Sequence, residues 1–298
     1  MNNLDFFVFG VARSGTTALT NAFNLHPDVF CGVECFHPAL DHSKLDIPVD
    51  FTNLDIVGER KANINSELMA KKESSSIFGN KFPRYYLHVD NVVGKSSGAA
   101  PIGIHRESLG FIPSWNDRAE VGTGWNKGRG GVAGIIEQFI FFSAILKARS
   151  DFKIFSYDEL FFNDLGMIEK VYASVDAPIL SEVIEKYKTT TFQNKAVMNK
   201  VRIFSDVEKF ALEKLKLDEI DLLFKMNSGE YFSSYSEKIK KAFDISLLSF
   251  YDILPELLDN AGEIGRAYIK TQIRDYKLSD KDISYAVSNI LEAQSRAT

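Results

Sequence analysis

Two glycines five residues apart, followed by hydroxyl residues, form the clearest chemical signal in this sequence. The stretch consists of Gly10, Val11, Ala12, Arg13, Ser14, Gly15, Thr16 and Thr17. Glycine at position 15 allows a ligand to approach the backbone closely, and the threonines can add hydroxyl donors. Backbone N–H groups in such a loop, at the start of a helix, can surround a phosphate. The pattern favours a phosphate-binding loop over a strand-to-helix turn that needs two glycines for its shape alone.

The loop departs from the common nucleotide-triphosphate motif G-x-x-x-x-G-K-[ST]. Thr16 stands where that motif has its lysine, and the loop takes its positive charge from Arg13. In the common motif the lysine reaches the β- and γ-phosphates. Its absence argues against ordinary NTP hydrolysis. A P-loop kinase or NTPase with an unusual loop stays open as an alternative, with Asp158 as the residue that would hold Mg²⁺.

Soft and titratable side chains are concentrated between residues 31 and 42. Cys31, Cys35, His37 and His42 could together bind zinc, but their spacing is not the usual C-x2-C of zinc sites. Cys31 also falls in an expected strand, where a small buried residue is common. No metal is therefore expected. His37 is a candidate for proton transfer, because imidazole titrates near neutral pH.

The elements expected around the loop belong to an α/β fold. An apolar run at residues 4–9 predicts a buried strand, residues 16–25 a helix, and residues 29–33 a second strand. A strand, a glycine loop, a helix and a strand in this order indicate a central parallel sheet flanked by helices. Further segments expected are strands at 101–105 and 152–157, a helix that begins near 112, and a buried helix at 132–149. The region 161–298 is expected to be mostly helical.

Composition limits the class of protein. The chain has 298 residues, of which 45% are hydrophobic and 25% charged, which suits one globular domain spanning 1–298. The net charge of −5 argues against general binding to nucleic acid or to an anionic membrane. Two cysteines suit a reducing compartment, and the apolar runs are too short for a signal peptide. A cytoplasmic protein is expected, with no nucleic-acid or membrane partner.

Residues 7–27, FVFGVARSGTTALTNAFNLHP, resemble the 5′-phosphosulfate-binding segment of the sulfotransferase family. There an apolar strand runs into G-x-x-R-S-G-T-T, then a helix, then a Leu-His-Pro exit. The resemblance implies the P-loop-containing sulfotransferase fold and the donor 3′-phosphoadenosine 5′-phosphosulfate (PAPS). It also implies the residues that hold the 5′-phosphosulfate, namely Arg13, Ser14, Gly15, Thr16 and Thr17.

Two later segments also resemble this family. Arg106 ends an expected strand and Ser114 follows eight residues later, similar to the family's R-D-P-x-x-x-x-x-S, although the proline is missing here. The resemblance implies that both residues bind the 3′-phosphate, and guanidinium and hydroxyl groups suit that task. Residues 153–160, KIFSYDEL, resemble the family's structural strand and "YEDL" turn.

The acceptor side resembles carbohydrate sulfotransferases in particular. Residues 79–85, GNKFPRY, are similar to their G-x-K-x-P-x-Y segment, which implies that Lys81 lies near the transferred group. Glu34 stands where such enzymes often carry a glutamate, so it is the first candidate for the catalytic base and His37 the second. The resemblance implies transfer to an acceptor hydroxyl on a saccharide, with Arg13 also serving the reaction and without metal. A salt-bridged Glu34 and a solvated Lys81 stay open.

Several expectations concern the rest of the site. Residues 188–195, KTTTFQNK, are the best candidate for the family's late loop over the 3′-phosphate, but they lack its glycines. A non-catalytic nucleotide-binding module, whose late loop no longer closes, is therefore a further alternative. The glycine-rich residues 122–131 are expected to form a loop that either acts as a lid or contacts the acceptor, or else is a disordered surface loop. Aromatic residues that could stack on a sugar or belong to the core are Phe82, Tyr85, Tyr86, Trp115 and Trp125.

Overall fold

The structure is a computed structural model, which describes residues 4–34, 66–95, 98–120, 130–192 and 204–260, with short pieces at 262–263 and 266–267. The chain forms two compact units that interleave in sequence. Unit 1 comprises residues 1–107, 147–201 and 222–237, and unit 2 comprises residues 108–146, 202–221 and 238–298. The single domain expected over 1–298 stays a prediction.

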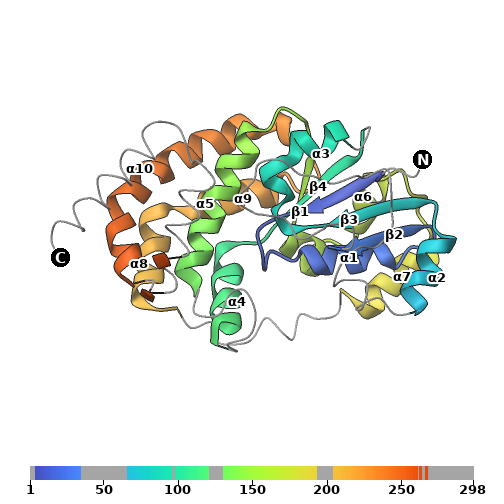
Figure 1. The fold of residues 1–298 in the computed structure, drawn as a ribbon, viewed down its shortest axis with the longest axis horizontal. Coiled ribbons are helices and arrows are strands. Elements are labelled where there is room, and N and C mark those ends of the chain that lie inside the picture. Colours follow the sequence, from blue (N-terminus) through green and yellow to red (C-terminus); the bar gives the residue numbers. More distant parts are fainter. Residues whose placement is uncertain are drawn as a thin grey trace. The chain divides into compact units, whose positions relative to one another are not determined.

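Unit 1 is built on a five-stranded parallel sheet (Figure 1). The strands are β1 (Phe6–Phe9), β2 (Val29–Val33), β3 (Ile77–Lys81), β4 (Ala100–His105) and β5 (Lys153–Ser156). Their order is β2-β3-β1-β4-β5, and every neighbouring pair is parallel. The central parallel sheet expected from the sequence is therefore confirmed, with β1 in its middle.

Successive residues of β1 point to opposite faces of the sheet, as the pleat requires. Phe6 and Val8 belong to a core cluster with residues of helices α1 (Thr16–Asn24), α6 (Met167–Ala173) and α7 (Ser181–Thr190). Phe7 meets Tyr85 edge-on at 5.4 Å, and Phe9 meets Phe152 at 5.5 Å. Because both faces of β1 are covered, an uninterrupted apolar sequence forms this strand.

Strand β3 was not expected from the sequence. Its polar end, Asn80 and Lys81, lacks the apolar run that identifies a buried strand. It nevertheless pairs with both β1 and β2, and Phe6 lies opposite Gly79. A Cβ at Gly79 would lie 2.2 Å from the Phe6 ring, so glycine is what lets the two strands pack at this point.

The remaining elements of unit 1 are mostly helical. They are α2 (Ser66–Ser74), η2 (Pro83–His88), α3 (Val89–Lys95), the π-helical turn η3 (Glu159–Asn163), η5 (Phe232–Ser234) and the end of α9 (Leu217–Met226). The Leu-His-Pro exit from α1 is held by its histidine. His26 Nδ1 accepts the Asp28 N–H, and Nε2 therefore donates to the Pro178 carbonyl at 2.9 Å.

Unit 2 is helical in the residues that the structure describes. It contains α4 (Ser108–Glu120), α5 (Gly131–Lys147), α8 (Asp206–Leu215), the start of α9 and most of α10 (Ser236–Asn260). The buried helix expected at 132–149 is confirmed as α5, and Phe139 stacks on Phe250 of α10 at 4.5 Å. Helix α4 begins four residues before the expected start at 112, because Asp221 accepts the Ser108 N–H at 2.7 Å and caps it. Among the described helices, none combines the length and the apolar character that crossing a membrane requires.

Candidate functional site

The glycine loop lies at the carboxyl end of β1, where the chain turns into α1. Arg13 and Gly15 have φ angles of 77° and 102°, in the left-handed region. A Cβ at Gly10 would lie 2.5 Å from the Ile104 carbonyl oxygen of β4, so only glycine fits there. The glycine-bounded loop expected over residues 10–15, between a strand and a helix, is confirmed.

The loop uses one of its backbone N–H groups for its own turn. The Ser14 N–H donates to the Val11 carbonyl at 3.0 Å, so it closes the loop's own turn. The first intrahelical bond of α1 runs from Leu19 N–H to the Gly15 carbonyl, which leaves the N–H groups of the first turn, from Thr16 onward, pointing out of the helix end. The expected role of Ser14 in holding the 5′-phosphosulfate stays a prediction.

The hydroxyl of Ser14 differs from the Ser14 N–H, which has a hydrogen-bond partner in the loop. The residue is 2% exposed, and its hydroxyl has no hydrogen-bond partner among the residues that the structure describes. A buried hydroxyl without a partner is costly, and a bound anion would satisfy it. Thr16 is buried, whereas Arg13 and Thr17 are exposed. The loop thus combines the buried hydroxyl of Ser14 with the exposed side chains of Arg13 and Thr17, and this set of donors suits an anionic ligand.

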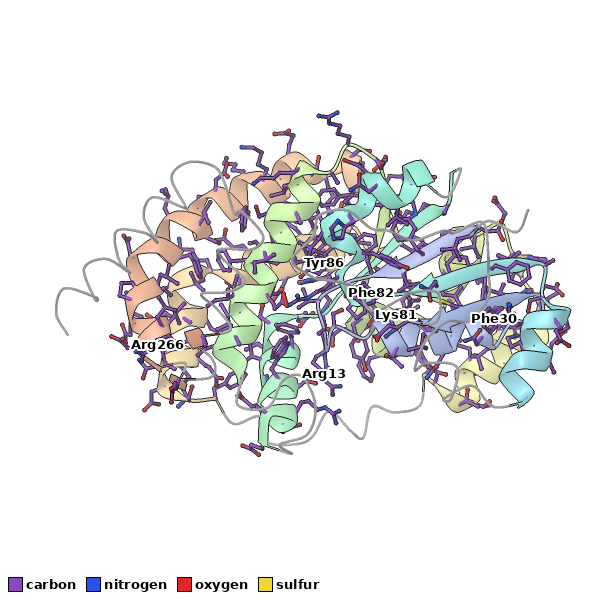
Figure 2. All side chains as sticks on the ribbon, in the orientation of Figure 1. Arg13, Phe30, Lys81, Phe82, Tyr86 and Arg266 are labelled. Atoms are coloured by element: carbon purple, nitrogen blue, oxygen red, sulfur yellow. The ribbon has the colours of Figure 1, made fainter. Side chains whose placement is uncertain are left out.

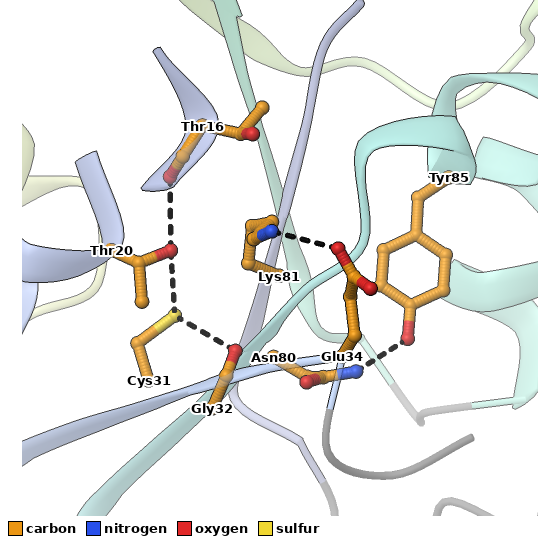
Figure 3. A network of polar contacts seen from close by, with 8 residues as sticks. All are labelled: Thr16, Thr20, Cys31, Gly32, Glu34, Asn80, Lys81 and Tyr85. Carbon is orange, nitrogen blue, oxygen red and sulfur yellow. Dashed lines mark hydrogen bonds and ion pairs between the residues drawn. The ribbon is translucent and has the colours of Figure 1, made fainter. Parts of the chain in front are cut away.

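Lys81 and Glu34 form an ion pair at the ends of neighbouring strands (Figure 3). Lys81 Nζ lies 2.9 Å from Glu34 Oε1, and the two side chains are 4% and 21% exposed. The sheet register builds this pair, since Val33 lies opposite Lys81 and the Glu34 N–H donates to the Lys81 carbonyl at 2.8 Å. The solvated surface lysine is excluded, and the salt-bridged Glu34 is observed. Whether Glu34 also acts as a base stays a prediction.

Arg106 follows β4 and lies over an aromatic ring. Its Cζ is 4.7 Å from the ring centre of Tyr157, which follows β5. Beside them, Lys225 of α9 lies 3.5 Å from a carboxylate oxygen of Glu107 and 3.6 Å from one of Glu159. Burial alone would lower the pKa of Lys225, but these two carboxylates outweigh it and raise that pKa. Lys225 therefore stays charged and links Glu107, the residue after Arg106, to Glu159, which lies in the turn after β5.

All these side chains follow the carboxyl ends of parallel strands in unit 1. The glycine loop follows β1, Glu34 follows β2, Lys81 ends β3, Arg106 follows β4 and Tyr157 follows β5. Figure 2 marks Arg13 and Lys81 among them. Ligands of open α/β sheets bind at this edge, and the site is therefore placed there.

The sequence-predicted residues are only partly brought together. Ser114 is half-buried in α4, which belongs to unit 2, so its pairing with Arg106 stays a prediction. His37, Cys35 and His42 lie outside the described residues, as do residues 121–129 with Trp125. Among the described residues, no cluster of histidine, cysteine and carboxylate side chains could hold a metal ion.

The structure also describes two other groups of candidate residues. Residues 188–190 of the candidate late loop end helix α7, where Lys188 pairs with Glu185 at 3.8 Å, and residues 193–195 lie outside the described part. Tyr85, Tyr86 and Trp115 are at most 2% exposed, so they belong to the core and cannot stack on a sugar. Phe82 is half-buried and packs edge-on against Tyr85 at 5.5 Å.

Sequence reasoning missed two members of the site. Tyr157 was expected to have a purely structural role, and Lys225 gave no motif signal at all. For Tyr157 a signal was present: it follows an expected strand, as Arg106 does, and carboxyl ends of parallel strands meet at one edge. Lys225 could be identified only from the structure, in which the end of α9 brings it next to Glu107 and Glu159.

Comparison with known proteins adds little to this geometry. No protein-family profile and no curated protein matches the chain. Among solved structures, it is similar to a sulfotransferase from Alicyclobacillus acidocaldarius, with 13% identity over 63% of this chain and 91% of the other, and a TM-score of 0.38. It is also similar to the sulfotransferase STF9 from Mycobacterium avium, with 15% identity over 70% of this chain and 72% of the other, and a TM-score of 0.43. Both scores are below 0.5, so the assignment of function depends on the chain's own residues.

Proposed function

We propose that this chain is a sulfotransferase that moves a sulfuryl group from PAPS to an acceptor hydroxyl. One observation carries the proposal. The G-x-x-R-S-G-T-T loop lies at the carboxyl end of the central strand, with the buried hydroxyl of Ser14 left without a partner among the described residues. The lysine that NTP hydrolysis uses at position 16 is replaced by threonine, which disfavours an ordinary ATPase.

Sulfuryl transfer resembles phosphoryl transfer, in which positioning and charge stabilisation do most of the work. Arg13 and the first N–H groups of α1 would hold the 5′-phosphosulfate. Lys81 would neutralise the charge that grows on the leaving oxygen, because its ammonium is fixed by Glu34 rather than free to rotate in solvent. Removing one such donor typically costs about 3 kcal/mol of transition-state stabilisation.

Glu34 is the proposed base for the acceptor hydroxyl. Its carboxylate is part of the same ion pair, so proton acceptance and charge neutralisation would occur side by side. His37 is the alternative base. We further propose a carbohydrate acceptor, supported only by the resemblance of residues 79–85. The 3′-phosphate is assigned to Arg106, whose guanidinium can bind phosphate through two N–H groups, with Ser114 as a second donor.

The test is calorimetric titration with adenosine 3′,5′-bisphosphate, with 5′-AMP and with ATP, each without metal. We expect the bisphosphate to bind at least tenfold more tightly than 5′-AMP, a gain typical of one charge-assisted phosphate contact. Arg106→Ala should abolish that preference. Arg149→Ala, an exposed arginine at the other end of β5, is the matched control and should keep it.

Three results would overturn the proposal. Equal affinity for the bisphosphate and 5′-AMP would remove the donor site. ATP binding that appears only with Mg²⁺ would favour the P-loop kinase alternative. Tight bisphosphate binding without turnover of PAPS on any sugar or other hydroxyl compound would favour a non-catalytic nucleotide-binding module.

A further inference from the structure

The ring of Tyr157 lies between the glycine loop and Arg106. A Cβ built at Gly15 would lie 2.2 Å from Tyr157 Cδ2 and 2.7 Å from Cε2, so the bare glycine backbone rests directly against the ring. The Arg106 guanidinium carbon lies 4.7 Å from the centre of the same ring. One side chain therefore contacts both of the places where a phosphate is proposed to bind.

Neighbouring rings hold Tyr157 in place. Its ring centre is 4.8 Å from that of Phe161 and 5.6 Å from that of Phe162, both in the π-helical turn η3 that follows β5. Lys225 joins Glu159 of the same turn to Glu107, the residue after Arg106. Because the turn is tied to β4 in this way, a shift of the ring would disturb the loop and the arginine together.

We propose that Tyr157 is a positioning residue that couples the glycine loop to Arg106, so that the two phosphate groups of one nucleotide are bound cooperatively. The inference rests on the proposed function. The ring acts through two of its sides: its Cδ2–Cε2 edge lies against Gly15, and its face carries the flat guanidinium, which stacks well on an aromatic ring. No hydrogen bond of the phenol hydroxyl is required.

This coupling has a measurable signature. The ratio of the Kd for 5′-AMP to the Kd for the bisphosphate reports the gain from the 3′-phosphate alone. If the ring positions Arg106, its loss should reduce that ratio, whereas a simple loss of stability would leave the ratio unchanged. Two residues that act as a unit also give non-additive effects in a double-mutant cycle.

The experiment measures this ratio by calorimetry in the full chain for wild type, Tyr157→Phe, Tyr157→Leu, Arg106→Ala and the double variant Tyr157→Leu/Arg106→Ala. We expect Tyr157→Phe to keep the wild-type ratio and Tyr157→Leu to lower it about five- to tenfold, as for the loss of one stacked cation. In the Arg106→Ala background, Tyr157→Leu should change the ratio less than twofold. Phe152→Leu removes a buried ring that packs on Phe9 and Phe232 at the other end of β5, and it should leave the ratio unchanged.

The outcomes separate the two proposals. If wild type shows no preference for the bisphosphate, the proposed function fails and the inference falls with it. If wild type shows the preference but Tyr157→Leu keeps it, or lowers it equally with and without Arg106, the inference alone is overturned. A loss in Tyr157→Phe would also overturn it, because the hydroxyl would then be the contact. Should Tyr157→Leu not fold, Tyr157→Met, with a side chain of more similar length, takes its place in the cycle.

Discussion

At the scale of single residues, Gly15 decides whether the loop can keep its shape. Its φ of 102° is costly for any other residue, and the Tyr157 ring fills the space that a side chain would need. The glycine is thus required twice, by the backbone and by its neighbour.

Gly15→Ala should weaken binding of adenosine 3′,5′-bisphosphate at least tenfold and destabilise the fold by about 1–3 kcal/mol, because strain and overlap add. The measurements are titration calorimetry and urea unfolding. Gly94→Ala, at a helical position of α3 with nothing within 4 Å of the added Cβ, is the matched control. It should leave binding unchanged. Equal affinity in both variants would contradict a tight loop at Gly15.

The Lys81–Glu34 pair gives a second prediction. Glu34→Gln should lower kcat about 100-fold, because the base and the partner that fixes Lys81 are lost together. The Kd for the bisphosphate should change less than threefold, measured by calorimetry beside steady-state turnover of PAPS. Glu185→Gln breaks the exposed pair with Lys188 and should alter neither value. Unchanged turnover in Glu34→Gln would shift the base to His37.

At the scale of elements, Glu208 fixes the start of α8 and binds α4. It closes a capping box with Ser205, and Asn116 Nδ2 donates to its carboxylate at 2.9 and 3.1 Å. Asn116 Oδ1 in turn accepts the N–H of Gly131, the first residue of α5. One buried carboxylate therefore organises three helix segments of unit 2.

Glu208→Gln should destabilise the protein by about 1–3 kcal/mol, because a buried hydrogen-bonded charge is replaced by an amide that meets another amide. A fall in the urea midpoint at constant slope would show it. The same substitution at the exposed Glu213 of α8 should cost less than about 0.5 kcal/mol. A similar midpoint for both variants would refute this role of Glu208.

Asp90, in the first turn of α3, ties that helix to the chain before β5. Its carboxylate accepts the N–H groups of Arg149 and Ser150 at 2.7–3.1 Å. Burial opposes the charged form, but these bonds outweigh it, so the pKa of Asp90 lies below its usual value. A lowered pKa stabilises the fold above the unfolded-state value and loses that contribution as pH falls through the folded one.

Asp90→Asn should therefore be less stable than wild type by about 0.5 kcal/mol at pH 7, since the carboxylate is partly exposed. The gap should shrink as pH falls below about 4, where the unfolded chain binds its proton. Urea unfolding at several pH values measures it. Asp244→Asn, in an exposed pair with Lys240, should show no such trend. A gap that is constant from pH 7 to pH 3 would disprove the assignment.

At the scale of the whole molecule, the two residues proposed to bind the 3′-phosphate belong to different units. Arg106 follows β4 in unit 1, and Ser114 lies six residues after the start of α4 in unit 2. Ser114→Ala should weaken bisphosphate binding about fivefold and leave 5′-AMP binding unchanged, as expected for one lost hydrogen bond to the 3′-phosphate. Titration calorimetry with the bisphosphate and with 5′-AMP measures both affinities. Equal bisphosphate affinity would confine the 3′-phosphate site to unit 1.

Much of the site's framework could be predicted from the sequence, because the signals are local. Glycine spacing and the apolar run before it predicted β1, the loop and α1, and the strand at 29–33 agrees with β2 to the residue. Strand β3 could not be predicted. Whether a short polar-ended segment pairs with two strands depends on chain that is distant in sequence.

The sequence by itself determined the strand, the glycine loop and the helix, since each depends on conformational preference and apolar spacing within a few residues. Only the tertiary structure decided which groups meet at the sheet edge. Insertion of β3 between β1 and β2 brings Lys81 to Glu34 across 47 residues of chain, and packing of β5 beside β4 places the Tyr157 ring under Arg106. Strand order follows from how the whole core packs, and no local pattern contains that information.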